Sequence, residues 1–165
     1  MNVYSLLDIL FVPVYLFIIL FSARIYQAKR QVQNPEYKYL LPGLVAKIIG
    51  GVGLALVYTL YYPGGDTLQY YWDSLAFQKL MFVDFKSFWH VFTNKAEIAN
   101  YYYFNDETGY PAYCRDPKAW FVVKVSLFMV GISMQSYLIT TILCSTLSFI
   151  GIWKMFRVDR KSTRL

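Results

Sequence analysis

Charged residues are scarce in this chain. Lys, Arg, Asp and Glu make up 16% of the 165 residues, whereas 57% are hydrophobic, and the mean hydropathy is +0.35. Because charged residues account for about a quarter of a typical soluble domain, this composition argues against a soluble protein. Aromatic residues make up 20%, and Tyr and Trp favour places where one end of the side chain lies in hydrocarbon and the other near water. The composition therefore predicts a membrane protein.

Cysteine and histidine are almost absent, which removes several kinds of site. Cys114 lies in a polar segment and Cys144 in the middle of an apolar run, so a disulfide between them would join water to the bilayer core. The single histidine, His90, is expected to be an interfacial residue rather than a ligand. The chain has no Cys/His metal spacing, no phosphate-binding glycine loop and no Ser/His/Asp order. The chemistry of soluble enzymes is therefore not supported.

The net charge of +6 does not indicate nucleic acid as a partner, because of where the basic residues lie. They cluster in the short segment 23–39 and in the tail 154–165, each of which follows an apolar run. Membrane proteins place Lys and Arg at such positions on the cytoplasmic side. Lys154 and Arg157 in the tail are expected to contact anionic headgroups at the membrane interface.

Three apolar runs indicate the fold class. Each is close in length to the about 20 residues that a helix needs to cross the hydrocarbon core. They are 6–25, 40–62 and 134–153. The first is not read as a cleaved signal, since residues 1–8 contain no Lys or Arg and do contain Asp8. We expect an all-α integral membrane protein that forms a single membrane domain, 1–165, with about three transmembrane helices. The lipid bilayer is its expected partner.

The segment 63–118 is expected to be a large outward loop that carries short amphipathic surface helices. Interfacial helices are expected at about 67–80, 84–94 and 117–133. Within the second of these, four aromatic residues are spaced i, i+3, i+4 and i+7 and so lie on one helix face. They are Phe85, Phe88, Trp89 and Phe92. Such a face suits the membrane surface or a groove in a partner, and it equally suits packing on the protein's own core.

The distribution of charge predicts the orientation. Segment 23–39 holds four Lys or Arg residues in its short length and the tail 154–165 holds five, whereas the much longer loop 63–118 holds only five. By the positive-inside rule, the connection and the tail face the cytoplasm. The N-terminus and the loop then lie outside the cytoplasmic membrane, and three spans satisfy this parity.

The second apolar run stops at the sequence Pro63-Gly64-Gly65-Asp66. Proline cannot continue a helix, and glycine adopts the left-handed conformation that ends one. Asp66 is then expected to cap the next helix, with Gln69 completing a capping-box pattern.

On that next helix, Asp66, Tyr70 and Asp73 are spaced i, i+4 and i+7 and share one face. Two carboxylates and a phenol on one face could hold a divalent cation. Alternatively, one carboxylate could accept a proton from a substrate hydroxyl, and ordinary capping and solvation remain the simpler interpretation. Further along, Arg115 suits a phosphate, although an ion pair with the adjacent Asp116 is an alternative. We predict Asp66 as the catalytic residue, and Tyr70, Asp73 and Arg115 as substrate-binding residues.

A span that ends in aromatic residues and is followed by Gly-Gly-Asp-Thr-x-x-Tyr-Tyr at 64–71 resembles the N-terminal part of GT-C-type membrane glycosyltransferases and related exopolysaccharide polymerases. The resemblance covers roughly residues 40–155. It implies that Asp66 is the essential acid of the first outward loop, that residues 85–92 form a surface helix, and that the sugar donor is a polyprenyl-linked lipid.

The chain departs from that family in having about three spans where the family has many more. This difference implies the front portion of a larger protein, a truncated product or a subunit completed by others. Two hypotheses follow: part of a glycosyltransferase, or a non-catalytic membrane subunit. In the second, Gly50, Gly51 and Gly53 provide a smooth face against which partner helices pack.

Overall fold

The computed structural model describes the backbone of residues 6–62 and 64–162, and all regular secondary structure in these ranges is helical. The helices are α1 (Leu6–Gln31), α2 (Leu40–Leu60), α3 (Asp66–Val83), α4 (Phe85–Thr93), α5 (Pro117–Ile132) and α6 (Tyr137–Ser162), with short 3-10 helices at Pro35–Tyr39 and Ile98–Tyr103. The predicted all-α membrane fold is confirmed. Three segments of the described chain are long and apolar enough to cross a membrane. They are Leu10–Gln31, Pro35–Leu60 and Tyr137–Arg160.

Two of the long helices continue beyond the apolar runs that predicted them. α1 ends at Gln31 rather than at 25, because residues 26–31 contain no helix breaker and Lys29 and Arg30 in its last turn complement the helix dipole. α6 continues to Ser162 rather than ending at 153, since the intervening residues also lack proline and glycine. Much of the expected polar connection 23–39 and of the basic tail is therefore helical.

The last apolar segment divides close to the predicted point. α5 ends at Ile132 and α6 begins at Tyr137 rather than at 134. Met134 and Gln135 between them have φ values of 51° and 63°, the left-handed conformation that turns the chain. At about 1.5 Å per residue, the 16 residues of α5 extend only about 24 Å, short of the about 30 Å hydrocarbon core.

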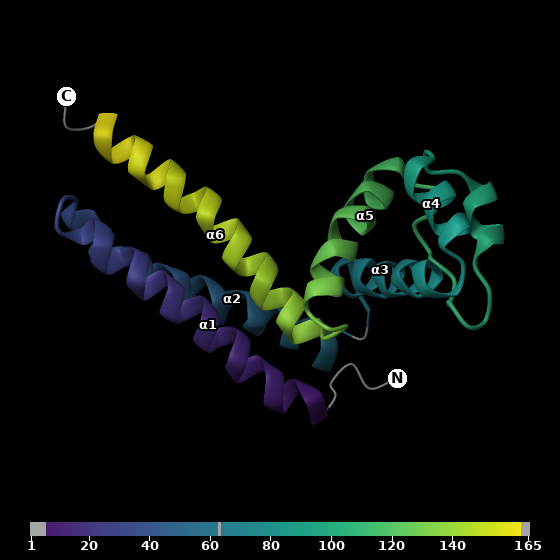
Figure 1. Ribbon diagram of the computed structural model, residues 1–165, viewed down its shortest axis with the longest axis horizontal. Helices are drawn as coiled ribbons and strands as arrows, with labels where there is room; N and C mark the ends of the chain where they lie inside the picture. The colour runs from purple at the N-terminus through teal and green to yellow at the C-terminus, as the bar shows by residue number, and fades with distance from the viewer. Residues whose placement is uncertain (1–5, 63, 163–165) are drawn as a thin grey trace.

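α1, α2 and α6 form one bundle, in which α6 lies along both other helices (Figure 1). Its core is a cluster of buried side chains from the 3-10 helix before α2, from the first half of α2 and from α6. The cluster contains Tyr37, Leu40, Leu44, Ile48, Ile142, Phe149 and Trp153. Gly51 allows α2 to approach α6 closely, because a Cβ at this position would overlap the Ser145 hydroxyl.

The two basic segments of the chain lie at the same end of this bundle. The Arg157 guanidinium, near the end of α6, lies 5.1 Å from the centre of the Tyr37 ring in the connection after α1. Tyr37 also packs edge-on against Trp153, with ring centres 5.5 Å apart. The helices α3, α4 and α5 adjoin the opposite end of the bundle (Figure 1).

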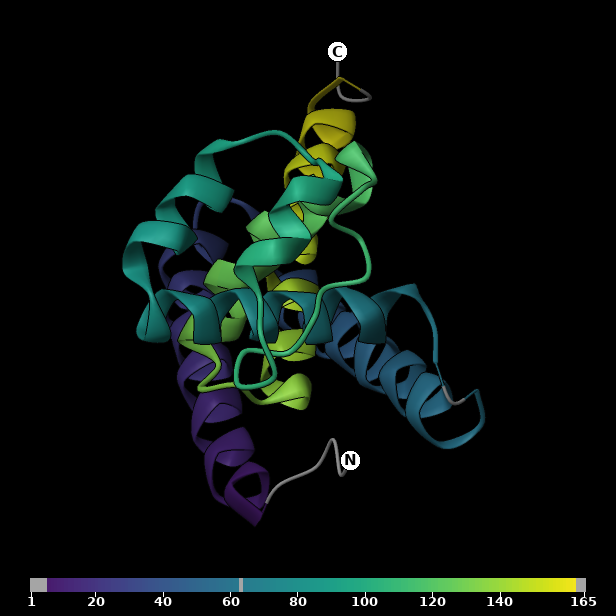
Figure 2. The same ribbon diagram turned by 90° about the vertical axis from the view of Figure 1, so that its right-hand side faces the viewer.

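α3, α4 and α5 form a second unit with a core of its own, seen from its outer side in Figure 2. Phe77 on α3 is fully buried and stacks on Trp120 of α5, with ring centres 5.3 Å apart. Val91 of α4 and Val123 of α5 are fully buried in the same cluster. This unit therefore holds α3 in a fixed position relative to the segment 98–116 that closes it.

The aromatic face of α4 is divided between two environments. Phe88 is 6% exposed and Phe92 is partly buried, and both pack on Phe77. Phe85 and Trp89 are 64% and 55% exposed. Packing on the protein's own core thus accounts for half of this face, while the other half stays available to a membrane surface.

Two tyrosine hydroxyls join the bundle to the second unit. Tyr71 of α3 donates a hydrogen bond to the carbonyl oxygen of Gln135 at 2.6 Å, in the turn before α6. Tyr15 of α1 donates to the carbonyl oxygen of Ile132 at 2.6 Å. The relative position of the two units is thereby fixed at the turn between α5 and α6.

Candidate functional site

The turn between α2 and α3 brings the predicted motif back onto the bundle. Gly64 and Gly65 have φ values of 118° and 153°, which favour glycine. A Cβ on Gly65 would lie 2.6 Å from the Tyr58 ring, so the close approach of this turn to α2 also requires glycine. The glycines that the sequence predicts to end the helix are therefore required in this turn by their φ values and by the contact with Tyr58.

The predicted capping box at Asp66 is wrong. The N-cap residue of α3 is Gly65, whose carbonyl oxygen accepts from the amides of Leu68 and Gln69. Asp66 is the first helical residue, and its side chain does not cap the helix. Because Gly65 caps through its backbone alone, the Asp66 carboxylate is left for another partner, and its negative charge still suits the N-terminal end of the helix.

That partner is Tyr113, a residue that no sequence pattern marks. The Tyr113 hydroxyl donates a hydrogen bond of 2.8 Å to Oδ1 of Asp66, and Asp66 itself is exposed. The hydrogen bond to Asp66, together with burial, raises the pKa of Tyr113 to about 12. Tyr113 consequently stays protonated at neutral pH and orients the Asp66 carboxylate.

Asp73 is 1% exposed, and both of its carboxylate oxygens accept hydrogen bonds. Oδ1 accepts from Nε2 of Gln69 at 2.6 Å and from the amide of Ala112 at 3.1 Å, and Oδ2 accepts from the amide of Tyr113 at 2.8 Å. Burial raises the pKa of Asp73 above its ordinary value, while these three hydrogen bonds act in the opposite direction. This geometry favours a role in holding segment 111–113 on α3, and substrate binding by Asp73 stays a prediction.

Tyr70 completes the group, because its ring centre lies 5.0 Å from that of Tyr113. The three residues predicted to share one face of α3 therefore all contact a single residue, Tyr113. It contacts Asp66 through its hydroxyl, Tyr70 through its ring and Asp73 through its amide. Several other tyrosines lie near Tyr113 in the sequence, and no pattern distinguishes Tyr113 from them.

Arg115 lies apart from this group as an exposed residue. The adjacent Asp116 caps α5, since its Oδ1 accepts from the amides of Lys118 and Ala119 at 2.9 and 3.4 Å. Asp116 therefore acts as the N-cap of α5, and its ion pair with Arg115 stays a prediction. Phosphate binding by Arg115 stays a prediction.

The donor set around Asp66 and Asp73 does not fit a divalent cation. Asp73 already accepts three hydrogen bonds from nitrogen atoms. Among the described residues, no group of three or more His, Cys, Asp or Glu side chains is placed to hold a metal ion. Hard cations need several oxygen ligands free to coordinate, and Asp66 and Asp73 do not provide them.

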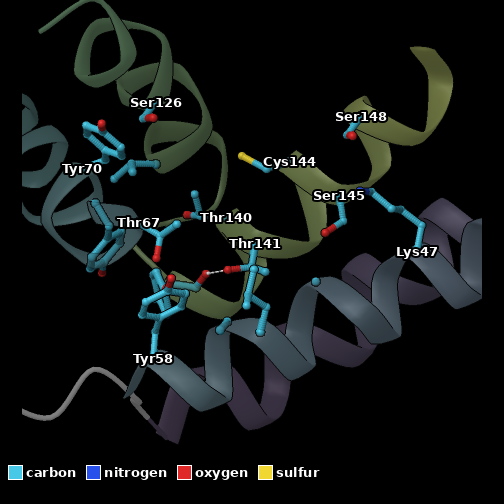
Figure 3. A pocket seen from close by; sticks show the side chains of 16 residues that line it. Lys47, Tyr58, Thr67, Tyr70, Ser126, Thr140, Thr141, Cys144, Ser145 and Ser148 are labelled. Carbon is cyan, nitrogen blue, oxygen red and sulfur yellow. Dashed lines mark hydrogen bonds between the residues drawn. The ribbon is translucent and has the colours of Figure 1, made fainter. Parts of the chain in front are cut away.

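Beside this group, a cavity of about 320 Å³ lies where α2 and α6 meet α3 and α5. Its polar lining comes from all four helices (Figure 3) and includes Lys47, Tyr58, Thr67, Tyr70, Tyr71, Ser126, Tyr137, Thr140, Thr141, Cys144, Ser145 and Ser148. Thr67 and Tyr70 connect it to the Asp66 group, since Thr67 follows Asp66 directly. Hydroxyl groups are the commonest polar groups in this lining, which suits a ligand that carries hydroxyls of its own.

Lys47 is the only charged side chain among the described residues that line this cavity. It belongs to Pro35–Leu60, one of the segments long and apolar enough to cross a membrane, and extends from α2 toward α6 (Figure 3). Ionisable side chains inside a membrane span usually face the protein interior or a water-filled cavity and mark functional sites. The cavity is therefore the strongest candidate site in the described part of the chain.

Comparisons with models of protein families, with curated proteins and with solved structures found no match to this chain. The assignment of a function consequently depends on the geometry of the site and on the sequence motif.

Proposed function

We propose that this chain is the membrane-embedded front part of a glycosyltransferase or polysaccharide polymerase that acts on a polyprenyl-linked sugar. The reaction takes place at the outer face of the cytoplasmic membrane, with the N-terminus outside and the C-terminus in the cytoplasm. Asp66 accepts the proton of the acceptor hydroxyl while the hydroxyl oxygen bonds to the anomeric carbon and the lipid phosphate leaves.

The observation that carries this proposal is the cavity lined by Thr67 and Tyr70 beside Asp66. Its hydroxyl groups offer donors and acceptors to a sugar, and Lys47 offers a positive charge to a phosphate. The Tyr113 hydroxyl donates to Oδ1 of Asp66, so the carboxylate keeps Oδ2 for a second hydrogen bond. A carboxylate oriented in this way is suited to accept a proton.

Two further observations support the proposed membrane orientation and the proposal that other helices or subunits complete the site. Both basic segments lie at one end of the bundle, as Arg157 beside Tyr37 indicates, and α3 to α5 adjoin the other. The cavity of about 320 Å³ is at the small end of the about 300–1,000 Å³ typical of ligand sites. A sugar with its phosphate would occupy much of a cavity of this size, which supports the proposal that other helices or subunits accommodate the acceptor.

The non-catalytic membrane subunit is the second candidate, and the outer flank of α2 favours it. Cβ atoms added at Gly50 and Gly53 would have no neighbour within 4 Å, and Ile49 and Leu54 beside them are 66% and 55% exposed. A smooth apolar flank of this kind allows a partner helix to approach closely.

Replacing Asp66 by asparagine tests the catalytic role. The asparagine side chain keeps an oxygen that accepts from Tyr113, so the fold should be retained, but it cannot accept a proton. We expect Asp66→Asn to lower sugar incorporation by membranes from polysaccharide-producing cells by about 100-fold or more, with unchanged protein levels on an immunoblot. Asp106→Asn is the matched control, because Asp106 is an exposed acid that accepts from Tyr110 in the same segment.

Normal incorporation by Asp66→Asn at a normal protein level would contradict catalysis by this acid. Purification in mild detergent then separates the two candidates. Copurified polyprenyl-linked sugar supports the transferase, and a stoichiometric protein partner without such a lipid supports the non-catalytic subunit.

A further inference from the structure

A second cavity, of about 510 Å³, lies between α1, α2 and α6, away from the Asp66 group. Its lining changes in character along the helices. Ile18 and Ile19 of α1 and Phe149 of α6 give it an apolar wall, whereas Tyr26, Lys154 and Arg157 line it nearer the ends of α1 and α6. On α1 and α6 the polar residues lie five to eight residues beyond the apolar ones, which at about 1.5 Å per residue corresponds to about 8–12 Å. The cavity is therefore apolar on one side and cationic on the other.

Two hydrogen-bond donors in this lining have no partner. Nε1 of Trp153 and Nε of Arg157 are both buried and form no hydrogen bond, and Trp153 as a whole is 9% exposed. Buried polar groups without a partner are uncommon and call for a specific explanation. Because both atoms are donors, the missing partner has to be a hydrogen-bond acceptor.

The side chains on the cationic side of the cavity are held in position by contacts with the rest of the protein. The Arg157 guanidinium lies over the Tyr37 ring at 5.1 Å, which holds it in place. Lys154 lies three residues earlier, on the same face of α6. Among the described residues that line the cavity, these two are the only charged ones, so the charge selects an anion.

We propose that this cavity binds an anionic phospholipid of the leaflet in which α1 and α6 end. The phosphate accepts hydrogen bonds from Arg157 and Trp153 and pairs with Lys154, and the acyl chain lies along Ile18, Ile19 and Phe149. Basic pockets between membrane helices bind anionic headgroups in this way. The site is independent of the Asp66 group and of the reaction proposed for it.

The apolar wall and the charge together distinguish this occupant from others. Free phosphate satisfies the donors but leaves the apolar part of the cavity without a ligand. A zwitterionic lipid carries a cationic group that Lys154 and Arg157 repel. An anionic lipid with an acyl chain satisfies both sides.

Native mass spectrometry of the full chain in mild detergent tests this proposal, with phosphatidylglycerol and phosphatidylcholine of identical acyl chains as the added lipids. We expect the protein to retain phosphatidylglycerol in preference to phosphatidylcholine. Because each cation near an anionic headgroup is worth about 1 kcal/mol, Arg157→Gln and Lys154→Gln should each weaken phosphatidylglycerol binding about fivefold. Trp153→Phe keeps the packing but removes the donor, and it should weaken binding a few-fold.

Arg160→Gln is the matched control, because it removes the same charge from the same helix but Arg160 does not line this cavity. Equal retention of the two lipids would overturn the proposal, as would equal weakening by Arg160→Gln and Lys154→Gln. Inorganic phosphate that raises the unfolding temperature as much as phosphatidylglycerol would also overturn it, since the acyl chain would then contribute nothing. Lys154 is exposed, so its variant tests the site even if Arg157→Gln does not fold.

Discussion

At the scale of the residue, the buried carboxylate of Asp73 holds the closing segment onto α3. We predict that Asp73→Asn destabilises the protein by about 1–3 kcal/mol, because the new amide group would face one of the three donors and leave it without an acceptor. Denaturant unfolding followed by tryptophan fluorescence measures this change. Glu107→Gln, at an exposed position in the same segment, should have little effect. Equal stabilities of the two variants would contradict the assigned role of Asp73.

The same variant reports on the dependence of stability on pH. Burial raises the pKa of Asp73 in the folded state, so the folded protein binds this proton more readily than the unfolded chain does. The contribution of Asp73 to the unfolding free energy should therefore decrease as pH rises from the unfolded pKa of about 3.9 to the raised folded pKa, and should be constant above it. Subtracting the pH profile of Asp73→Asn from that of the wild type isolates this term. A difference that increases with pH in this window would mean that the hydrogen bonds outweigh burial.

The sequence predicted which residues of α3 share a face, but not what they contact. Spacing along one helix is local, so Asp66, Tyr70 and Asp73 could be grouped from the chain alone. Tyr113 is 47 residues from Asp66 and comes from an irregular segment, and no periodicity marks such a residue. The capping prediction failed for a related reason, because Gly65 uses only its backbone to begin α3.

At the scale of the element, a lysine on α5 stabilises the end of α4. Nζ of Lys124 donates to the carbonyl oxygens of Phe92 and Asn94 at 2.6 and 2.8 Å, and a cation at a helix C-terminus also complements the dipole. We predict that Lys124→Met increases amide hydrogen exchange in residues 85–94 about five- to thirty-fold, the equivalent of about 1–2 kcal/mol. Lys118→Met is the control, since Lys118 is exposed on the same helix. Unchanged exchange in α4 would show that Lys124 does not hold it.

Helix positions were predictable where apolar periodicity decides them, and helix ends were not. Counting apolar residues locates the part of a helix that suits hydrocarbon, which is why the runs at 6–25 and 134–153 fall largely within α1 and α6. It does not detect that Lys, Arg and Gln continue a helix into water as readily as leucine does. In α4, the period identified the aromatic face, but only the position of Phe77 decides that Phe88 is buried while Phe85 is exposed.

At the scale of the whole molecule, the cavity beside Asp66 is assembled from four helices that are far apart in the sequence. Lys47 and Ser148 line the same space although about a hundred residues separate them. Each of these residues looks ordinary within its own segment, so the sequence gives no reason to group them. The apolar runs predict that a bundle forms, and the packing of α2 against α6 then determines where the cavity lies.

Two glycines on α2 test how this packing relates to the proposed functions. Gly51 faces Ser145 of α6, and a larger side chain there would force the two helices apart. We predict that Gly51→Leu destabilises the bundle by about 1–3 kcal/mol and reshapes the cavity that Gly51 lines. Gly53→Leu should leave the isolated chain as stable as the wild type, because no atom lies within 4 Å of the added Cβ. Thermal unfolding of both variants in the same detergent measures the difference.

The Gly53→Leu variant also separates the two candidate functions, because it changes only the outer flank of α2. If partner helices pack on this flank, Gly53→Leu should lose a copurifying membrane protein while keeping its own stability. If the flank faces lipid, the added leucine is as apolar as its surroundings and copurification should not change. Loss of a partner by Gly53→Leu together with normal sugar incorporation would favour the non-catalytic subunit. Loss of both would mean that the transferase requires the partner on α2.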